Sequence, residues 1–157
     1  MCIRDSDNLV EIRDLSVAFV SGDNHRQVVN SISFDIRRGE TLALVGESGS
    51  GKSVTAHSIL RLLPYPLAQH PSGTIHYDGQ DLLKLPERKL RGIRGNRIAM
   101  VFQEPMTSLN PLHSIEKQIN EVLALHKGLR GKAATQRTLE LLEPVSYTHL
   151  RAHETLR

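Results

Sequence analysis

The sequence predicts an α/β fold built around one glycine-rich loop. Residues 41–45 form a short apolar run of the kind found in a strand that is buried on both faces. Glycines recur through residues 46–51, and residues 52–63 then place apolar side chains at helical spacing. Pro64 follows as a helix stop. This order of buried strand, glycine-rich loop and helix is typical of α/β folds.

Strands are also expected before the loop. Residues 10–19 mix apolar and polar side chains as a strand does, and residues 21–26 are rich in turn-forming residues. Ile32, Phe34 and Ile36 then alternate with polar residues, which is the period of a half-buried strand. These patterns predict two strands joined by a turn.

Strand and helix patterns alternate again after the loop. Residues 73–77 are expected to form a strand that ends in the hairpin-type turn Asp78-Gly79. Residues 84–97 are rich in Lys and Arg and predict a solvated helix and loop. Residues 98–102 form a second apolar run, which predicts another buried strand.

Two helices are expected in the rest of the chain. Apolar residues recur at helical spacing between residues 115 and 123. Glycines at positions 128 and 131 separate this helix from another over residues 132–143, which Pro144 is expected to end.

The composition is that of an ordinary globular protein. The chain has 157 residues, of which 39% are hydrophobic and 24% charged, so it suits one domain or part of a larger one. The net charge of +3 permits an anionic ligand without demanding nucleic acid. Aromatic residues make up 4% and Trp is absent, which leaves little for stacking on single-stranded bases. The one cysteine, Cys2, excludes an internal disulfide and a cysteine zinc site.

The glycine-rich loop fits the motif G-x-x-x-x-G-K-[ST] at every fixed position. Its residues are Gly46, Glu47, Ser48, Gly49, Ser50, Gly51, Lys52 and Ser53. Glycines let successive backbone N–H groups point inward, where they and the N-terminus of the next helix hold phosphate oxygens. Lys52 is expected to reach the β- and γ-phosphates, and the Ser53 hydroxyl to bind Mg²⁺. The motif therefore predicts that the loop binds the phosphate groups of a nucleotide.

The motif alone leaves the reaction open, because kinases, GTPases and motor ATPases all use it. A GTPase also needs an Asn-Lys-x-Asp segment that reads guanine, and the sequence contains none. The residues around the loop therefore have to indicate which of the remaining classes of phosphate-loop protein this is.

Two stretches resemble the ATP-binding cassette (ABC) ATPases. The first is residues 39–53, and the second is residues 101–111, Val-Phe-Gln-Glu-Pro-Met-Thr-Ser-Leu-Asn-Pro. The second stretch is similar to the glutamine loop of the subfamily that powers oligopeptide, dipeptide and nickel importers. Within that subfamily the chain most resembles the first ATPase half of a tandem peptide-importer component. The resemblance runs from about residue 9 to residue 145.

The resemblance implies a fold and further site residues. The fold would be a P-loop NTPase core of the RecA-like type, with an N-terminal antiparallel β-subdomain and the start of an α-helical subdomain, truncated. Gln103 would contact Mg²⁺ and sense the γ-phosphate, and it would serve the catalytic cycle together with Lys52. Phe19 matches the position at which the family stacks an aromatic ring on adenine, although the family most often has Tyr there and core packing explains Phe19 equally well. Residues 112–143 would form the helical part that docks on membrane subunits.

The implied function is that of the ATP-binding subunit of an ABC importer for peptides or similar small solutes. Its cofactors would be ATP and Mg²⁺. Its partners would be transmembrane permease subunits, a second ATPase domain and, indirectly, a periplasmic solute-binding protein, with no nucleic acid. It would lie peripherally on the cytoplasmic face of the inner membrane. The alternatives are a non-transport ABC-type ATPase and an ATP-binding fragment without turnover.

The chain carries the Walker A motif and the glutamine loop but not the rest of the family's catalytic apparatus. It has no apolar run ending in Asp-Glu, no Leu-Ser-Gly-Gly-Gln signature and no switch histidine after such a strand. The full-length parent is therefore expected to be an ATPase, and this fragment to be inactive alone. In this fold the Asp-Glu strand would lie beside residues 42–45, which would otherwise expose apolar faces and unpaired edges.

The two ends of the chain do not resemble the family. Residues 1–6 and 146–157 are interpreted as translated adapter sequence, which leaves residues 8–145 as the N-terminal part of the ATPase domain. His149 and His153 have the i, i+4 spacing of helical metal ligands. Both lie within residues 146–157, which are interpreted as adapter sequence, so we do not expect a metal site there.

Overall fold

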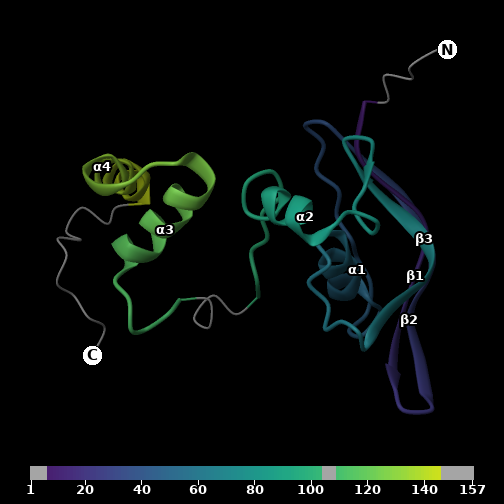
Figure 1. The fold of residues 1–157 in the computed structure, drawn as a ribbon. Helices are drawn as coiled ribbons and strands as arrows, with labels where there is room; N and C mark the ends of the chain where they lie inside the picture. Colours follow the sequence, from purple (N-terminus) through teal and green to yellow (C-terminus); the bar gives the residue numbers. More distant parts are fainter. Residues whose placement is uncertain (1–6, 104–108, 146–157) are drawn as a thin grey trace. The chain divides into compact units, whose positions relative to one another are not determined.

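The computed structural model of the chain describes residues 7–103 and 109–145. The chain divides into two compact units, Met1–Arg91 and Gly92–Arg157. The first unit holds a β-sheet and helix α1 (Lys52–Ile59), and the second holds helices α3 (Ile115–Lys127) and α4 (Gly131–Leu142) (Figure 1). A 3₁₀ turn, Glu143–Val145, follows α4, so Pro144 ends the α-helix as expected.

The sheet is entirely antiparallel. Its four strands are β1 (Asn8–Ser21), β2 (Asn24–Arg37), β3 (Ala68–Tyr77) and β4 (Gln80–Asp81), in the order β2-β1-β3-β4. The predicted N-terminal antiparallel β-subdomain is confirmed. The first turn is shorter than the turn-rich sequence suggested, because β1 and β2 pair as far as Ser21 and Asn24 and leave two residues between them.

Strand β1 supplies more buried residues than any other described element of the first unit, and its pattern of burial changes at a bulge. Val10 and Ile12 are buried at alternate positions, whereas the four consecutive residues 15–18 are all buried. The change falls where the register with β2 shifts, between Ile12 and Leu15, and where Asp14 adopts a φ of 48°. An extra residue in one strand moves every later side chain to the opposite face. Burial at alternate positions therefore holds only for the first half of this strand.

Hydroxyl groups satisfy the backbone around this bulge. Ser16 is buried, and its Oγ accepts hydrogen bonds from the Ser31 N–H at 3.0 Å and from the Ser72 Oγ at 3.0 Å. Ser72 Oγ also lies 2.9 Å from the carbonyl oxygen of Asp14. Side-chain partners of this kind replace the ladder bonds that a bulge removes.

Helix α1 ends earlier than its proline signal predicted. Arg61 adopts a left-handed φ of 50°, its N–H donates to Ser58 O at 3.0 Å, and the Leu62 N–H donates to His57 O at 2.9 Å. These two bonds define a Schellman motif, which closes the helix after Ile59. The prediction that the helix runs to residue 63 is therefore wrong, because the backbone turns three residues before Pro64.

The two runs that were expected to form buried strands do not form them. Residues 41–45 are all exposed, with Leu42 at 39%, Leu44 at 43% and Val45 at 87%. Val101 is 94% exposed and Phe102 49%, and Ile98 makes only an isolated bridge to Arg94. Both predictions are wrong for this structure. A strand needs a neighbour for its N–H and C=O groups, and none of the strands in the described ranges pairs with residues 41–45.

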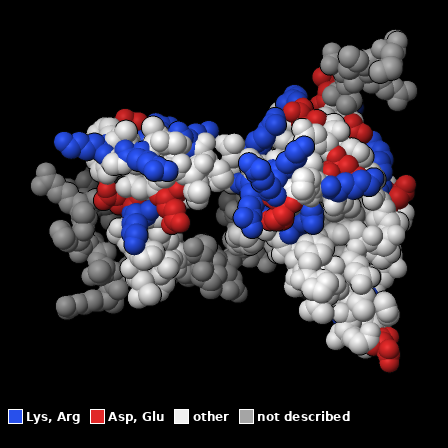
Figure 2. All heavy atoms as spheres, viewed as in Figure 1, with Lys and Arg blue, Asp and Glu red and all other residues white. Residues whose placement is uncertain are grey.

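The basic segment forms the expected solvated helix. Lys and Arg side chains gather around α2 (Glu87–Ile93) in the space-filling view (Figure 2). Two of them have acidic neighbours, since Lys84 Nζ lies 3.0 Å from Asp81 and Arg91 Nε lies 3.6 Å from Glu87. The helix is not solvated all round, because Leu90 and Ile93 are buried.

The second unit contains a helix pair held by packing and by polar contacts. Leu123 on α3 and Ala134 and Thr138 on α4 are buried. Thr138 Oγ1 donates to Asn120 Oδ1 at 2.7 Å, and Thr135 Oγ1 donates to Glu116 Oε1 at 2.8 Å. Helix α3 begins at the N-cap Ser114 and ends at Gly128, which has a φ of 69°. Both helices predicted from residue spacing are confirmed. Among the described helices, none has the length and apolar character needed to cross a membrane.

Gly73 provides a test of the bulge. It has a φ of +96°, and a Cβ built there would lie 2.5 Å from Leu15 Cα and 2.7 Å from Arg13 O. Gly73→Ala should lower the free energy of unfolding by about 2–5 kcal/mol, because backbone strain and steric overlap add. Urea denaturation measures this loss. Gly79→Ala is the control, since Gly79 has a φ of +76° and open space around it, and it should cost only about 1–2 kcal/mol. Equal losses would contradict the close approach.

His70 should make the first unit sensitive to acid. Its ring stacks on Tyr65 at 5.8 Å between centroids, and its Nε2 is buried without a hydrogen-bond partner. Burial, and secondarily the charge of Arg61, lower the pKa of His70 below 6.5. The unfolded chain therefore binds this proton more readily, and stability should fall as the pH drops through about 6.5.

Urea midpoints at about pH 7.5 and about pH 5.5 test this linkage. His70→Gln should show a smaller fall between the two values than the original chain. His25→Gln, at an exposed position in the β1–β2 hairpin, serves as the comparison and should keep the original pH dependence. An unchanged pH dependence in His70→Gln would show that His70 does not contribute.

Candidate functional site

The phosphate loop, residues 46–53, lies at the N-terminus of α1 and is exposed except at Gly51 and Lys52. Gly51 is the N-cap residue, with a φ of 91° and no side-chain cap. A Cβ built on it would lie 2.9 Å from Val28 O and 3.0 Å from Val29 Cγ2. Only glycine fits this position, because both the backbone conformation and the neighbouring strand β2 exclude a larger side chain.

The ammonium group of Lys52 folds back over the loop. Its Nζ donates to Gly46 O at 2.8 Å, to Glu47 O at 2.6 Å and to Ser50 Oγ at 3.2 Å. An ammonium group has three donors, and these three contacts hold its charge at the centre of the loop. The loop is also tied internally, since the Ser50 N–H donates to Glu47 O at 3.2 Å.

The N-terminus of α1 adds to the positive potential of the loop. The first N–H groups of a helix have no partner within that helix, and they carry the positive end of its dipole. The first turn of α1 contains no acidic residue that would oppose this field. Ser53 lies on this turn and is exposed, so its hydroxyl is placed beside the same end of the helix. Cation, helix dipole and hydroxyl together suit an anionic ligand such as a phosphate group.

Phe19 and Gln103 lie in different units of the chain. Phe19 is half-buried on β1, where it pairs with Arg26 of β2 and Ala68 of β3. Gln103 is exposed in a bend of the second unit, at the end of the first described range. Their roles at adenine and at Mg²⁺ therefore remain predictions. Residues 104–108 of the glutamine loop lie outside the described residues, as do His149 and His153.

The described residues include no cluster of three or more His, Cys, Asp or Glu side chains that could hold a metal ion. A single hydroxyl such as Ser53 is not such a cluster. Mg²⁺ keeps several water ligands and is commonly bound together with substrate phosphates, so a hydroxyl beside the phosphate position is compatible with it.

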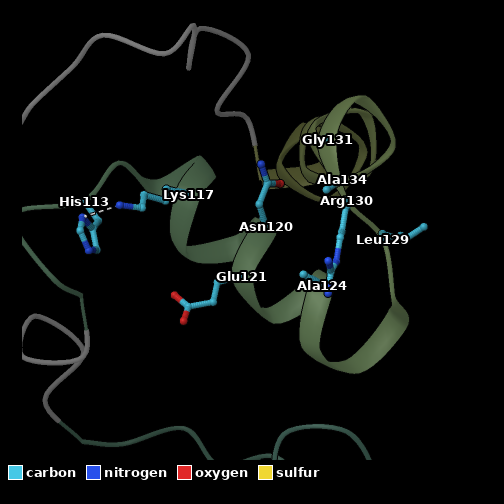
Figure 3. A pocket seen from close by; sticks show the side chains of 9 residues that line it. All are labelled: His113, Lys117, Asn120, Glu121, Ala124, Leu129, Arg130, Gly131 and Ala134. Atoms are coloured by element: carbon cyan, nitrogen blue, oxygen red, sulfur yellow. Dashed lines mark hydrogen bonds between the residues drawn. The ribbon is translucent and has the colours of Figure 1, made fainter.

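A shallow groove in the second unit is a weaker candidate site. It lies between α3 and α4 and is lined by side chains of both signs, including Lys117, Arg130 and Glu121 (Figure 3). Some of its polar groups already have partners, since Lys117 Nζ lies 3.3 Å from His113 Nδ1 and Asn120 accepts a bond from Thr138. The phosphate loop, where positive groups converge, is the stronger candidate.

Sequence reasoning missed the residues that support the loop from outside the motif. Val28 and Val29 approach Gly51 from β2, and this contact has no local sequence signal. Thr55 lies one turn into α1, and its buried hydroxyl donates to Gly51 O at 2.9 Å. Its spacing of four residues from Gly51 is the one signal that could have revealed it.

Comparison with known proteins identifies the class. The family model of the ABC transporter matches residues 29–156, a range that includes the whole phosphate loop. The chain therefore belongs to the ABC transporter family.

Individual relatives show which ABC transporter proteins the chain is similar to. The chain is 65% identical over 134 residues to the peptidoglycan transport ATP-binding protein YejF of Agrobacterium fabrum, which covers 85% of the chain and 24% of that protein. It is 58% identical to YejF of Escherichia coli, over 87% of the chain and 26% of the relative. It is 45% identical to the oligopeptide transport ATP-binding protein OppD of Bacillus subtilis, over 87% of the chain and 38% of the relative. The chain thus spans well under half the length of these relatives.

Solved structures support the fold. The ATP-binding cassette MJ0796, in a dimeric post-hydrolysis state bound to ADP and Pi, matches with a TM-score of 0.72 and 24% identity. The match covers 85% of this chain and 56% of that one. The predicted fold, a truncated P-loop NTPase with an antiparallel β-subdomain, is confirmed. At this level of identity the match concerns the fold alone.

Proposed function

We propose that the chain is the N-terminal part of the ATP-binding subunit of an ABC importer for peptides or similar small solutes. The observation that carries the proposal is the phosphate loop, where Lys52 is held within reach of three loop oxygens at the N-terminus of α1. The relatives named as peptide, oligopeptide and peptidoglycan transport proteins supply the class of solute.

The loop would hold ATP through its triphosphate. The N–H groups at the start of α1 would donate to phosphate oxygens, and the Lys52 ammonium would exchange its loop carbonyls for the β- and γ-phosphates. Ser53 would provide a hydroxyl ligand to Mg²⁺, which neutralises phosphate charge when bound. Gln103 would provide a second Mg²⁺ ligand and report the presence of the γ-phosphate to the membrane partner. Phe19 would stack on adenine.

Hydrolysis would be a property of the full-length subunit. Phosphoryl transfer depends on positioning and on charge stabilisation, and it needs a residue that orients the attacking water. The phosphate loop supplies positive charge, but the sequence has no apolar run ending in Asp-Glu, whose Glu would polarise that water. The chain by itself would therefore bind Mg-ATP without turning it over. A non-transport ABC ATPase is less well supported, because the named relatives are transport proteins.

The partners follow from the same assignment. A second ATPase domain would complete the site, in keeping with the dimeric state of the cassette MJ0796. Transmembrane permease subunits would receive the helical segment that contains α3 and α4, and a periplasmic solute-binding protein would act through them. The subunit would lie on the cytoplasmic face of the inner membrane.

Lys52→Ala should weaken Mg-ATP binding by about 100-fold or more, because it removes the charge that pairs with the β- and γ-phosphates. Isothermal titration of the chain with Mg-ATP measures the dissociation constant. Lys89→Ala, which removes the same charge from an exposed position on α2, should leave it unchanged.

In the full-length protein, Lys52→Ala should abolish ATP-dependent solute uptake. If Lys52→Ala binds Mg-ATP as tightly as the original chain, the assignment of the phosphate loop is wrong. If binding is lost but uptake of a labelled oligopeptide persists, the transport role is wrong.

A further inference from the structure

We infer that Thr55 is a positioning residue of the phosphate loop, an inference that rests on the function proposed above. Thr55 lies in α1, outside the G-x-x-x-x-G-K-[ST] motif, and is 3% exposed. Its Oγ1 donates to the carbonyl oxygen of Gly51 at 2.9 Å. The hydroxyl therefore contacts the loop from the side of α1, where it is buried, and would not touch a bound nucleotide.

The Gly51 carbonyl receives two hydrogen bonds from the same residue. The backbone N–H of Thr55 donates to it at 2.8 Å, in addition to the hydroxyl at 2.9 Å. A carbonyl oxygen has two lone pairs, so both donors can be satisfied at once. Two bonds restrict the direction of this carbonyl more than the single helical bond that an ordinary residue would supply.

The direction of this carbonyl decides where the next N–H points. The Gly51 C=O and the Lys52 N–H belong to one planar trans peptide group, and they point in opposite directions. Because Thr55 holds the carbonyl toward the body of α1, the Lys52 N–H is directed the other way, toward the loop. A fixed N–H needs no reordering when a phosphate oxygen arrives, and such preorganisation raises affinity.

Glycine makes this support necessary. Gly51 has a φ of 91° and no side chain to restrain it, so its peptide group would rotate more easily than that of any other residue. Strand β2 excludes a side chain at this position, since a Cβ built there would lie 2.9 Å from Val28 O. The restraint therefore comes from Thr55, whose two hydrogen bonds hold the Gly51 carbonyl at the point where the loop becomes a helix.

Ser58 shows what an ordinary helical hydroxyl does. It is 0% exposed, and its Oγ donates to Val54 O at 2.8 Å, which is the same i−4 geometry one turn further along α1. Serine and threonine often make this bond in helices without any role in binding. The carbonyl that Ser58 contacts lies within the helix and not at the phosphate loop, so Ser58 is a matched control for Thr55.

The experiment compares Mg-ATP affinity with thermal stability in four forms of the 157-residue chain: unmodified, Thr55→Val, Thr55→Ser and Ser58→Ala. Thr55→Val keeps the shape and removes the hydroxyl, and it should weaken Mg-ATP binding about fivefold, the factor of an ordinary neutral hydrogen bond. Thr55→Ser restores the donor and should bind nearly as tightly as the unmodified chain. Ser58→Ala should lower the melting temperature as Thr55→Val does, with no loss of affinity.

The outcomes separate this inference from the proposed function. Unchanged affinity in Thr55→Val, or an equal loss in Ser58→Ala at temperatures where both are folded, would overturn the role of Thr55 alone. If Thr55→Val does not fold, Thr55→Ser and Thr55→Ala are compared in its place, and equal affinity of these two would overturn it. Failure of the unmodified chain to bind Mg-ATP at all would overturn the proposed function, and this inference with it.

Discussion

The close approach of Gly51 to strand β2 is the constraint on which the site depends. A Cβ at this position would lie 2.9 Å from the carbonyl oxygen of Val28, so the loop can pass beside β2 and enter α1 only if this residue is glycine. The contact places the N-terminus of α1 against the sheet. The sheet is therefore the base against which the phosphate loop enters α1, and Lys52 Nζ donates to the loop carbonyls of Gly46 and Glu47.

The base itself is set by the bulge in β1. The register with β2 shifts after Ile12, the four residues 15–18 that follow are all buried, and Val17 pairs with Val29 beside Gly51. The buried Ser16 hydroxyl, which accepts from the Ser31 N–H and the Ser72 hydroxyl, replaces hydrogen bonds that the irregular register removes. A chain of contacts thus leads from the core of β1 through β2 to Gly51. Residues distant from the loop in sequence contribute in this way to its geometry.

Local signals in the sequence predicted most of the elements and the chemistry of the loop. Alternation revealed β2, helical spacing revealed α3 and α4, and fixed glycine and lysine positions revealed the site, because each of these features depends on residues close together in the chain. The predictions failed for residues 41–45 and 98–102. An apolar run indicates that a segment can be buried, but a strand forms only where another strand pairs with it. The residues of the run do not specify that partner.

The sequence by itself determined that this chain is an ABC family protein with a phosphate loop at residues 46–53, since the motif and the family resemblance are both properties of residue order. Only the tertiary structure decided how that loop is supported. The clash that requires Gly51, the carbonyl that Thr55 holds and the exposed side chains of Leu42 and Val45 all depend on which segments meet in space. Distances of this kind arise from packing between segments far apart in the chain, and no local pattern encodes them.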